Sequence, residues 1–494
     1  MRHPLPMREH LSDASHSTRL IGASMYSWLG RYSGFAPATS AASLPAAIVI
    51  CLCAGCSSVV SPYTRPVMDV PAAPAAPVII EAQWWKTFGD QVLDRLIDEA
   101  LVHNYDLATA AANVAEARAN LGAARSQLWP RVDAKVSTGM SKHQLTLASE
   151  SEIDEKVSTT AIGAAASWEA DLWGRIGQMN EAALARLSAS EHARNATQLS
   201  ISAAVAESYF QLRNLDSKLE ITRNTLVNLR AVSNFEFRRW KAQLGTELAY
   251  RQSLAEVAAI AARLPQIEAA RVRTELALKL LVGRTPRVMA QPLLRAADTA
   301  RIPDVPHEID SRVLLRRPDV ASAERLLAAA HADVNSVRAE RYPRLTLSAA
   351  AGWVASSSKL ISGWPLFWDV GADLMAPIFD AGLNESKVAA SDARRQQAIT
   401  HYEYVTATAF REAYEALVLI DTGDQQARAT AEEVDARRQA LALDEKSYEV
   451  GRTSKYEVLS QTIEVLNAEL TLSDAQLAQR LARSRYYKAM GGGF

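Results

Sequence analysis

Residues 104–134 read NYDLATAAANVAEARANLGAARSQLWPRVDA, and residues 317–347 read RPDVASAERLLAAAHADVNSVRAERYPRLTL. The two stretches align without a gap at a constant shift of 213 positions, so that Pro130 pairs with Pro343. Self-similarity at a fixed separation indicates that one structural unit occurs twice. A chain of 494 residues is long enough for two to four domains, and the repeat predicts one architecture used twice.

A second set of pairs continues the repeat farther along the chain. Trp173 pairs with Phe379, and Gly245 pairs with Gly451, both at a shift of 206. The second copy is therefore predicted to be seven residues shorter than the first between its proline and its second aromatic residue. We expect this difference to lie in a loop.

Each copy changes its hydrophobic period in the same order. An Ala-rich helix of about 25 residues comes first and ends before Pro130 or Pro343, because proline disfavours helix in the residue before it. Apolar and polar residues then alternate, which is the period of a β-strand. The alternation predicts two strands in each copy, over residues 131–148, 157–173, 344–355 and 366–379.

Long helices are predicted after the strands. Apolar residues recur every seven positions in the first copy, at Val205, Leu212, Leu219 and Leu226. This is the repeat of a coiled coil. Helices of roughly 64 residues, or about 96 Å at 1.5 Å per residue, are expected over residues 180–243 and 386–449.

Each long helix is expected to end in a reversal of the chain. The predicted breaks lie at residues 244–246 and 450–453. Glycine suits the left-handed position that follows a helix end. We therefore predict that Gly245 and Gly451 take that position.

Composition excludes several classes of protein. Lys and Arg total 54 and Asp and Glu total 55, so the formal net charge is −1 and gives no electrostatic case for a nucleic-acid partner. With 48% apolar residues, the chain is expected to fold around a sizeable core. No His-Glu-x-x-His motif, phosphate-binding glycine loop or Gly-x-Ser-x-Gly elbow occurs, and the histidines are scattered. We therefore expect no enzyme activity, no metal site and no cofactor.

The amino terminus has the features of a secretion signal. Residues 44–55 (LPAAIVICLCAG) are apolar but shorter than the roughly 20 residues of a membrane-spanning helix, and basic residues precede them. The following segment, Cys53-Ala54-Gly55-Cys56-Ser57, resembles the bacterial lipobox. This resemblance implies that residues 1–55 are a lipoprotein signal peptide and that Cys56 carries diacylglycerol and an N-palmitoyl group. Ser57, in place of the Asp that signals inner-membrane retention, implies an outer-membrane location.

Alternatives remain open at this end of the chain. A signal peptide cut at another position would leave Cys56 unmodified or discarded, and Met25 competes with Met1 as the first residue. All three cysteines, Cys51, Cys53 and Cys56, lie in this region, so disulfides and thiol catalysis are excluded from the rest of the chain.

Proline-rich stretches divide the chain further. Residues 61–77 hold five prolines, which predict an extended tether, because proline fixes φ and lacks an N–H donor. Five more prolines between residues 284 and 318 predict a connector. The expected order is signal peptide, lipidated N terminus with tether, first repeat, connector or equatorial region, and second repeat: residues 1–55, 56–80, 81–283, 284–316 and 317–494.

The alternating strands favour a membrane β-barrel, because backbone groups in lipid are satisfied only in helices or closed barrels. Four strands per chain are too few, since outer-membrane barrels use about eight or more. The chain is therefore predicted to form a homo-oligomer, and three copies would supply twelve strands. The competing interpretation is a lipid-anchored periplasmic coiled-coil scaffold that conducts nothing. That scaffold would have no use for two pairs of strands with apolar outer faces.

Six further motifs resemble one family over about 400 residues. They are Trp84-Trp85-Lys86-Thr87-Phe88-Gly89-Asp90, Asn104-Tyr105-Asp106-Leu107, Asp171-Leu172-Trp173-Gly174-Arg175, Arg316-Arg317-Pro318-Asp319-Val320, Pro377-Ile378-Phe379-Asp380-Ala381-Gly382 and Tyr448-Glu449-Val450-Gly451. With the lipobox, they make the chain similar to the TolC/OprM family of outer-membrane efflux channels, in its NodT-type lipoprotein branch.

The resemblance implies a fold and a set of partners. The fold is mainly helical, with a trimer that joins a 12-stranded β-barrel in the outer membrane to a long α-barrel in the periplasm. The trimer would be the exit duct of a tripartite pump, with a periplasmic adaptor and an inner-membrane transporter of the resistance-nodulation-division type. Drugs, dyes and other amphiphiles are the expected cargo. A metal ion, a protein or an oligosaccharide is the alternative cargo.

The same resemblance identifies candidate gate residues at the helix reversals. Tyr448, Gly451 and Glu457 fall on the tyrosine, the tip glycine and an acidic ring position of the family. Arg452 departs from the family pattern, in which the arginine follows the threonine, and Glu247 is a further candidate beside the first reversal. The competing interpretation is that these charges belong to the solvated face of a coiled coil.

Overall fold

The computed structural model describes residues 60–70, 81–146, 152–285, 301–306, 309–357 and 363–493. Two units are distinguished, Met1–Ser57 and Ser58–Phe494, and all of the described residues belong to the second unit. The predicted signal peptide, Cys56, the second half of the tether and much of the connector lie outside the described residues.

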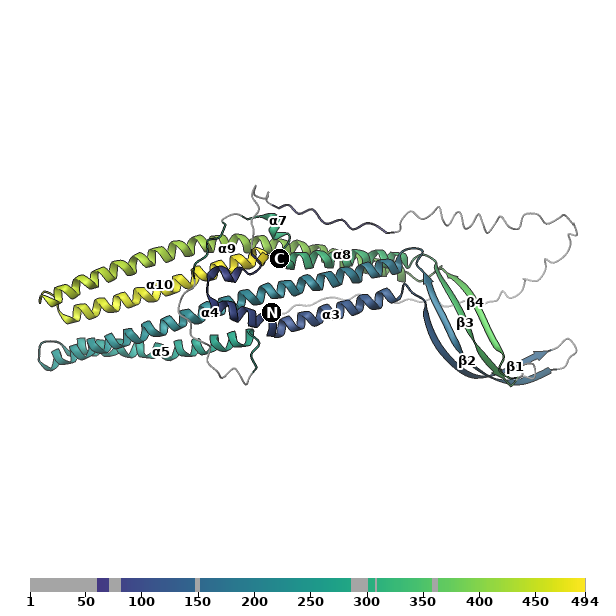
Figure 1. Cartoon of the computed structure of the whole chain (residues 1–494), viewed down its shortest axis with the longest axis horizontal. Helices are drawn as coiled ribbons and strands as arrows, with labels where there is room; N and C mark the ends of the chain where they lie inside the picture. The colour runs from purple at the N-terminus through teal and green to yellow at the C-terminus, as the bar shows by residue number, and fades with distance from the viewer. Residues whose placement is uncertain are drawn as a thin grey trace, which may run out of the picture. The chain divides into compact units, whose positions relative to one another are not determined.

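The elements follow the predicted order twice (Figure 1). The first half comprises the 3-10 helix η1 (Trp84–Phe88), α2 (Gln91–His103), α3 (Tyr105–Ser126), β1 (Arg131–Thr146), β2 (Glu152–Ala170), α4 (Arg175–Lys241) and α5 (Glu247–Leu281). The second half comprises α7 (Ser311–Leu314), α8 (Pro318–Ala339), β3 (Arg344–Ser356), β4 (Leu366–Met375), α9 (Leu383–Glu449), α10 (Lys455–Ala489) and the 3-10 helix η2 (Gly491–Gly493). The fold is thus mainly helical and internally duplicated.

The two halves match in length as well as in order. Helices α4 and α9 each have 67 residues, and α5 and α10 each have 35. The α3 and α8 helices align at the predicted shift of 213, but the bounds of the long helices align at 208. The predicted shift of 206 was therefore wrong, and the second copy is five residues shorter, not seven.

The helix starts explain this correction. Gly174 and Gly382 are the N-cap residues of α4 and α9, and both are left-handed, with φ of 77° and 86°. Their separation of 208 leaves Trp173 equivalent to Ala381, so the pairing with Phe379 was wrong. The sequence alignment had matched two aromatic side chains, whereas the backbone geometry of the helix starts sets the true register.

The four strands form one antiparallel sheet in the order β1-β2-β3-β4. The first and third strands begin at the predicted residues, Arg131 and Arg344. The fourth ends at Met375, four residues before the predicted end, because Pro377 has no N–H to donate to a ladder. The second ends at Ala170, because the Asp171 carboxylate turns to accept from the first N–H groups of α4.

Apolar side chains share one face of this sheet. Ile162 lies opposite both Val136 and Trp353, and Trp353 lies opposite Leu366, and residues directly opposite one another point to the same side. Ten large apolar side chains on this face are at least 39% exposed: Val132, Val136, Met140, Ile162, Leu347, Trp353, Leu366, Trp368, Val370 and Leu374. A contiguous exposed apolar face of this kind marks a surface that contacts a membrane or another protein.

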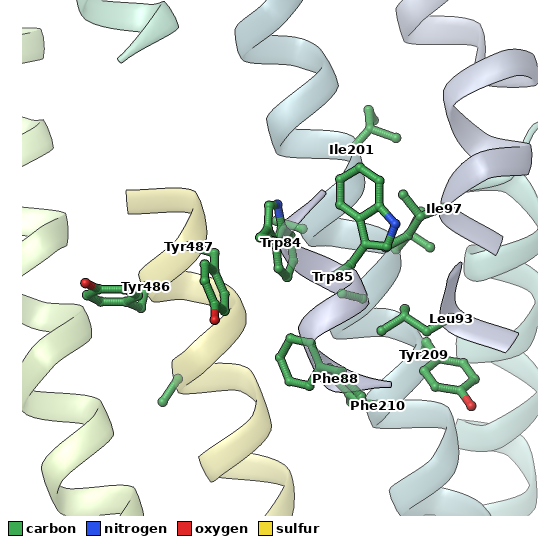
Figure 2. Close-up of a cluster of buried hydrophobic side chains, with 14 of the residues drawn as sticks. Trp84, Trp85, Phe88, Leu93, Ile97, Ile201, Tyr209, Phe210, Tyr486 and Tyr487 are labelled. Atoms are coloured by element: carbon green, nitrogen blue, oxygen red, sulfur yellow. The ribbon is translucent and has the colours of Figure 1, made fainter. Parts of the chain in front are cut away.

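The hydrophobic core packs η1, near the start of the first repeat, against α10, near the end of the second. Trp84 stacks on Tyr487 at 5.3 Å between ring centres, and Phe88 lies 5.0 Å from Phe210. Figure 2 shows these rings between the ribbons of η1, α4 and α10. The Trp84-Trp85 motif is therefore a core anchor. Within the described residues, no helix has both the length and the apolar character needed to cross a membrane.

The predicted heptad row is buried, with Val205, Leu212, Leu219 and Leu226 at most 6% exposed. Helix α4 contacts α5 and α10, and α10 contacts α9. The order of the long helices across the chain is therefore α5, α4, α10, α9.

The described part of the predicted tether is docked on the helices. Ser61 Oγ donates to Asn335 Oδ1 at 3.0 Å, and Arg65 Nε donates to Tyr402 OH at 3.0 Å. Tyr63 meets His331 edge to face, with 5.8 Å between ring centres. Residues 60–70 therefore pack against α8 and α9.

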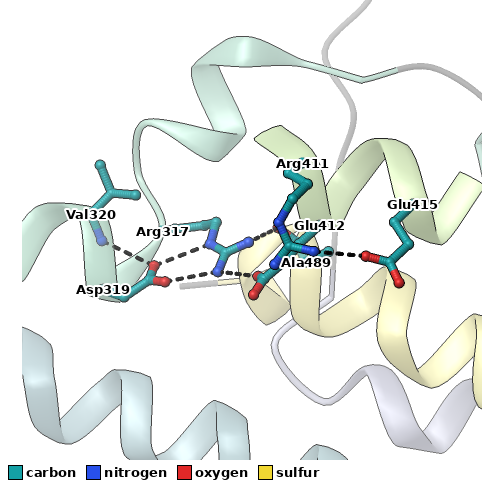
Figure 3. A network of polar contacts seen from close by, with 7 residues as sticks. All are labelled: Arg317, Asp319, Val320, Arg411, Glu412, Glu415 and Ala489. Carbon is teal, nitrogen blue, oxygen red and sulfur yellow. Dashed lines mark hydrogen bonds and ion pairs between the residues drawn. The ribbon is translucent and has the colours of Figure 1, made fainter. Parts of the chain in front are cut away.

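Arg317, from the Arg316-Arg317-Pro318-Asp319 motif, joins three helices (Figure 3). Its buried guanidinium donates to Asp319 at 2.7 Å, to Glu412 of α9 at 2.8 Å and to the carbonyl oxygen of Ala489 at 2.9 Å. The start of α8 is thus bound to α9 and to the end of α10.

Candidate functional site

The two helix reversals, α4 to α5 and α9 to α10, share one backbone geometry. In the first, Gln243 N–H donates to Trp240 O at 3.0 Å and Leu244 N–H to Arg239 O at 2.8 Å. In the second, Gly451 N–H donates to Tyr448 O at 2.9 Å and Arg452 N–H to Ser447 O at 2.8 Å. Both are Schellman motifs, which satisfy the free carbonyls at a helix C terminus.

The left-handed residue differs between the two reversals. Gly451 holds it in the second, with φ of 73°. In the first, Gln243 holds it, with φ of 58°, so the expectation for Gly245 was wrong. A Cβ on Gly245 would lie 3.1 Å from the Cβ of Arg239, so this glycine serves the close approach of two chain segments.

The side chain of Glu457 caps the N terminus of its own helix, α10. Its Oε2 accepts from the Ser454 N–H at 2.7 Å and from the Ser454 hydroxyl at 3.0 Å, and its N–H donates to Ser454 Oγ. This is a capping box at the start of α10. The hydrogen bonds from the Ser454 backbone and hydroxyl lower the pKa of the Glu457 carboxyl. The side chain is exposed and stays anionic at lower pH than an ordinary glutamate.

The other candidate residues lie at both reversals. Glu247 opens α5 and pairs with Arg251 at 3.0 Å. The Tyr448 ring lies 5.4 Å from the Lys455 ammonium. Arg452 is exposed and closes the second reversal through its backbone N–H. The structure therefore brings Tyr448, Arg452 and Glu457 to one hairpin and places Glu247 on the other.

An aromatic group that was not predicted from the sequence lies beside the first reversal. Trp240 stacks on Tyr250 at 5.6 Å, and Phe237 lies 5.2 Å from Tyr250. Lys241 covers Trp240 at 4.5 Å, and cation–π contacts of this kind stabilise exposed structure. Phe235 of α4 stacks on Tyr456 of α10 at 6.3 Å and joins the two hairpins. The clustering of aromatic residues on both sides of the break was the available sequence signal.

Equivalent positions of the two reversals carry opposite charges. At the shift of 208, Lys241 corresponds to Glu449 and Glu247 corresponds to Lys455. The two hairpins therefore have the same backbone geometry but opposite charges at these equivalent positions. Over the residues with described placement, no cluster of three or more His, Cys, Asp or Glu side chains is arranged to hold a metal ion.

Both halves of the chain match one family profile, described as outer membrane efflux protein, over residues 96–284 and 310–492. The chain belongs to the outer membrane efflux protein family. It is similar to the pyoverdine export outer membrane protein OpmQ of Pseudomonas aeruginosa, with 32% identity over 422 residues that cover 83% of this chain and 87% of OpmQ. It is also similar to the antibiotic efflux pump outer membrane protein ArpC of Pseudomonas putida, with 30% identity over 419 residues, 84% of this chain and 86% of ArpC.

A solved structure of the outer-membrane channel OprN superposes on this efflux protein with a TM-score of 0.77 and 27% identity, covering 88% of this chain and 99% of that one. This efflux protein is therefore an outer-membrane channel of an efflux pump and not an enzyme. It resides in the bacterial outer membrane with a helical extension into the periplasm. The prediction of an outer-membrane efflux channel is confirmed, and the alternative of a non-conducting scaffold is wrong.

Proposed function

We propose that this efflux protein works as a homotrimer whose three sheets close into one twelve-stranded barrel. The observation that supports the proposal is a four-stranded sheet with an exposed apolar face and two edge strands. Its four strands place most of their exposed large apolar side chains on one face, and β1 and β4 are edge strands. Four strands are too few for a membrane barrel, and a free edge in lipid leaves backbone groups without partners. Three copies would supply enough strands for a barrel and would pair every edge strand with a neighbour.

The trimer acts as the exit duct of a tripartite pump for drugs and other small amphiphiles. ArpC is named for antibiotic efflux and OpmQ for pyoverdine export, which supports a small-molecule cargo. A periplasmic adaptor protein and an inner-membrane transporter of the resistance-nodulation-division type complete the pump. The cargo is selected by the transporter and passes through this chain without chemical change.

The chain is anchored by lipid at Cys56, after removal of residues 1–55 as a signal peptide. Residues 56–80 lead to the first repeat at 81–283, and the connector 284–316 leads to the second at 317–494. The docked residues 60–70 support this order, because Val60 lies beside Gly174 at the junction of strands and helices. A Cβ added to Gly174 would lie 3.2 Å from Val60 Cγ2.

The gate lies at the helix reversals, where three copies of each charged residue approach the trimer axis. Glu457 forms an acidic ring that favours cations, and Glu247 contributes a second acidic position. Arg452 and Tyr448 link the closed tips. Charged rings select ions by sign in this way.

The proposal is tested by the native mass of the detergent-extracted protein. The expected result is a trimer with one triacyl modification on each chain. A Cys56→Ala variant that keeps its trimer but loses the lipid mass would assign the modification to that residue. A stable monomer would overturn the barrel, and an unmodified wild-type chain would overturn the lipid anchor.

A further inference from the structure

A pocket of about 550 Å³ lies where α3, α4 and α8 come together. Helix α4 contacts α3 on one side and α8 on the other, and Figure 1 shows α4 between them. The pocket contains none of the candidate gate residues at the helix reversals. Its volume lies within the roughly 300–1,000 Å³ of sites that bind drug-sized molecules.

The contacts around α4 show which side of the helical layer carries the pocket. Ala183 and Leu187 pack with α3. Gln178 and Ala189 accept hydrogen bonds from α8. At about 100° per residue, these two faces of α4 are roughly 150° apart, and Arg186, which lines the pocket, lies within that smaller angle. The pocket therefore opens on the concave side of the layer.

The docked residues 60–70 mark the opposite side. They contact His331 and Asn335 of α8. Asp333 lies two positions from each of these, and residues two apart on a helix do not face the same way. Asp333 instead forms an ion pair with Arg186 at the pocket. In the proposed trimer the concave side of the layer faces the axis, so the pocket opens toward the path of the cargo.

The pocket combines an apolar floor with polar walls. Ala117, Ala124 and Ala183 form the floor, where α3 packs on α4. Four exposed side chains of α3 form one wall, and within the described residues none of them is hydrogen bonded or ion paired: Asn113, Glu116, Asn120 and Gln127. Because Arg186 and Asp333 neutralise each other, Glu116 leaves the pocket with one uncompensated negative charge.

We propose that this pocket binds small cationic amphiphiles during their passage, with Glu116 as the counter-ion. The apolar part of the molecule packs on the alanine floor, and the amides of α3 donate and accept hydrogen bonds at its polar groups. A hollow with one sign of charge concentrates ligands of the opposite sign. This inference rests on the proposed function and adds to it a binding step inside the duct, at three equivalent places around the axis.

Binding of ethidium, a cationic dye, to the full trimeric protein in lipid nanodiscs tests the site by fluorescence anisotropy. Saturable binding of one ethidium per chain is expected, and fluorescein, an anionic dye, should bind more weakly. Glu116→Gln should weaken ethidium binding about fivefold, because one partly exposed charge pair is lost. Glu191→Gln is the matched control, because Glu191 pairs with Arg118 and does not line the pocket. Equal weakening by both variants would overturn the role of Glu116.

A second pair of variants tests the space independently of charge. Asn120→Trp fills the pocket and should abolish saturable ethidium binding. Ala111→Trp places the same bulk at an exposed position of α3 that does not line the pocket, and should leave binding unchanged. Unchanged affinity in both Glu116→Gln and Asn120→Trp, in protein that is trimeric by native mass, would overturn the site and leave the proposed duct intact. A monomer by native mass would instead overturn the proposed trimer and the inference with it.

Discussion

Gln243 and Gly451 occupy the same position in two matching reversals, and only one of them is a glycine. A residue with a Cβ pays roughly 1–2 kcal/mol in the left-handed region. The first reversal tolerates that cost because aromatic stacking around Trp240 holds both helix ends together. In the second, the glycine removes the cost directly.

Replacing Gly451 with Ala should destabilise the second reversal by about 1 kcal/mol, because φ is positive while no atom of the described residues would lie within 4 Å of the new methyl group. Hydrogen exchange over residues 440–460 should become about fivefold faster. The matched change Gln243→Gly should leave exchange at the first reversal unchanged or slower. Faster exchange in Gln243→Gly would contradict the assignment of the strain.

Glu457→Gln should raise the passage of anions relative to cations in planar bilayers. Glutamine also fits the third position of a capping box, so the change removes charge with little loss of the helix start. Because hydrogen bonds from Ser454 lower the pKa of Glu457, wild-type cation preference should persist as the pH falls to the ordinary range of glutamate, about 4.3. Glu247→Gln serves as the comparison. Identical ion selectivity in wild type and Glu457→Gln would refute a ring at this position.

At the scale of elements, each hairpin is tied by an ion pair between its two helices. Asp216 of α4 accepts from Arg271 of α5, and Asp424 of α9 accepts from Arg483 of α10 at 2.6 and 2.7 Å. The two aspartates correspond at the shift of 208. The guanidinium of Arg483 is 5% exposed, so removal of its partner leaves a nearly buried charge.

Asp424→Asn should cost about 3 kcal/mol at pH 7, because a buried charge loses its counter-ion. Arg483 holds the pKa of Asp424 below its ordinary value. The pair therefore contributes its full stability above the unfolded-state pKa of about 3.9, and that stability is lost as the pH falls through the native pKa. Thermal unfolding in detergent should show a gap between wild type and variant at pH 7 that narrows toward pH 3. A gap independent of pH would contradict this mechanism.

The sheet contains one place where two strands approach too closely for side chains. Gly163 lies opposite Gly352, and a Cβ on Gly163 would lie 2.5 Å from the Ala351 carbonyl oxygen. Gly163→Ala should destabilise the sheet by about 1–3 kcal/mol, since backbone atoms must move. The infrared β-sheet signal should be lost at lower temperature. Gly139→Ala, on the same face with open space around it, is the control, and equal behaviour of the two variants would exclude a steric cause.

At the scale of the whole molecule, Arg317 links the start of the second half to the end of the chain. Arg317→Ala would leave Glu412 and the Ala489 carbonyl without this donor and should cost about 3–5 kcal/mol. The amount of folded protein in the outer membrane should fall. The exposed neighbour Arg316→Ala should change stability by less than about 0.5 kcal/mol. Comparable losses in both variants would show that the motif acts in another way.

The sequence alone determined the duplication, the order of helices and strands, the apolar face of the sheet and the family. These features arise from local periods: apolar residues every second position in strands and every seventh in α4, and prolines between elements. Val205, Leu212, Leu219 and Leu226 are buried because a heptad row must face a partner wherever the helix packs.

Only the tertiary structure decided the register of 208, the left-handed Gln243, the capping role of Glu457 and the docking of residues 60–70. Each of these features depends on the residue at which a helix or strand ends, or on which distant residue packs beside it. Similarity between side chains along the sequence contains neither kind of information. The shift of 206 matched Trp173 to Phe379 by aromatic character, whereas Gly174 and Gly382 begin the two long helices 208 residues apart. Helix ends are set by backbone hydrogen bonds and caps, which the three-dimensional fold brings together.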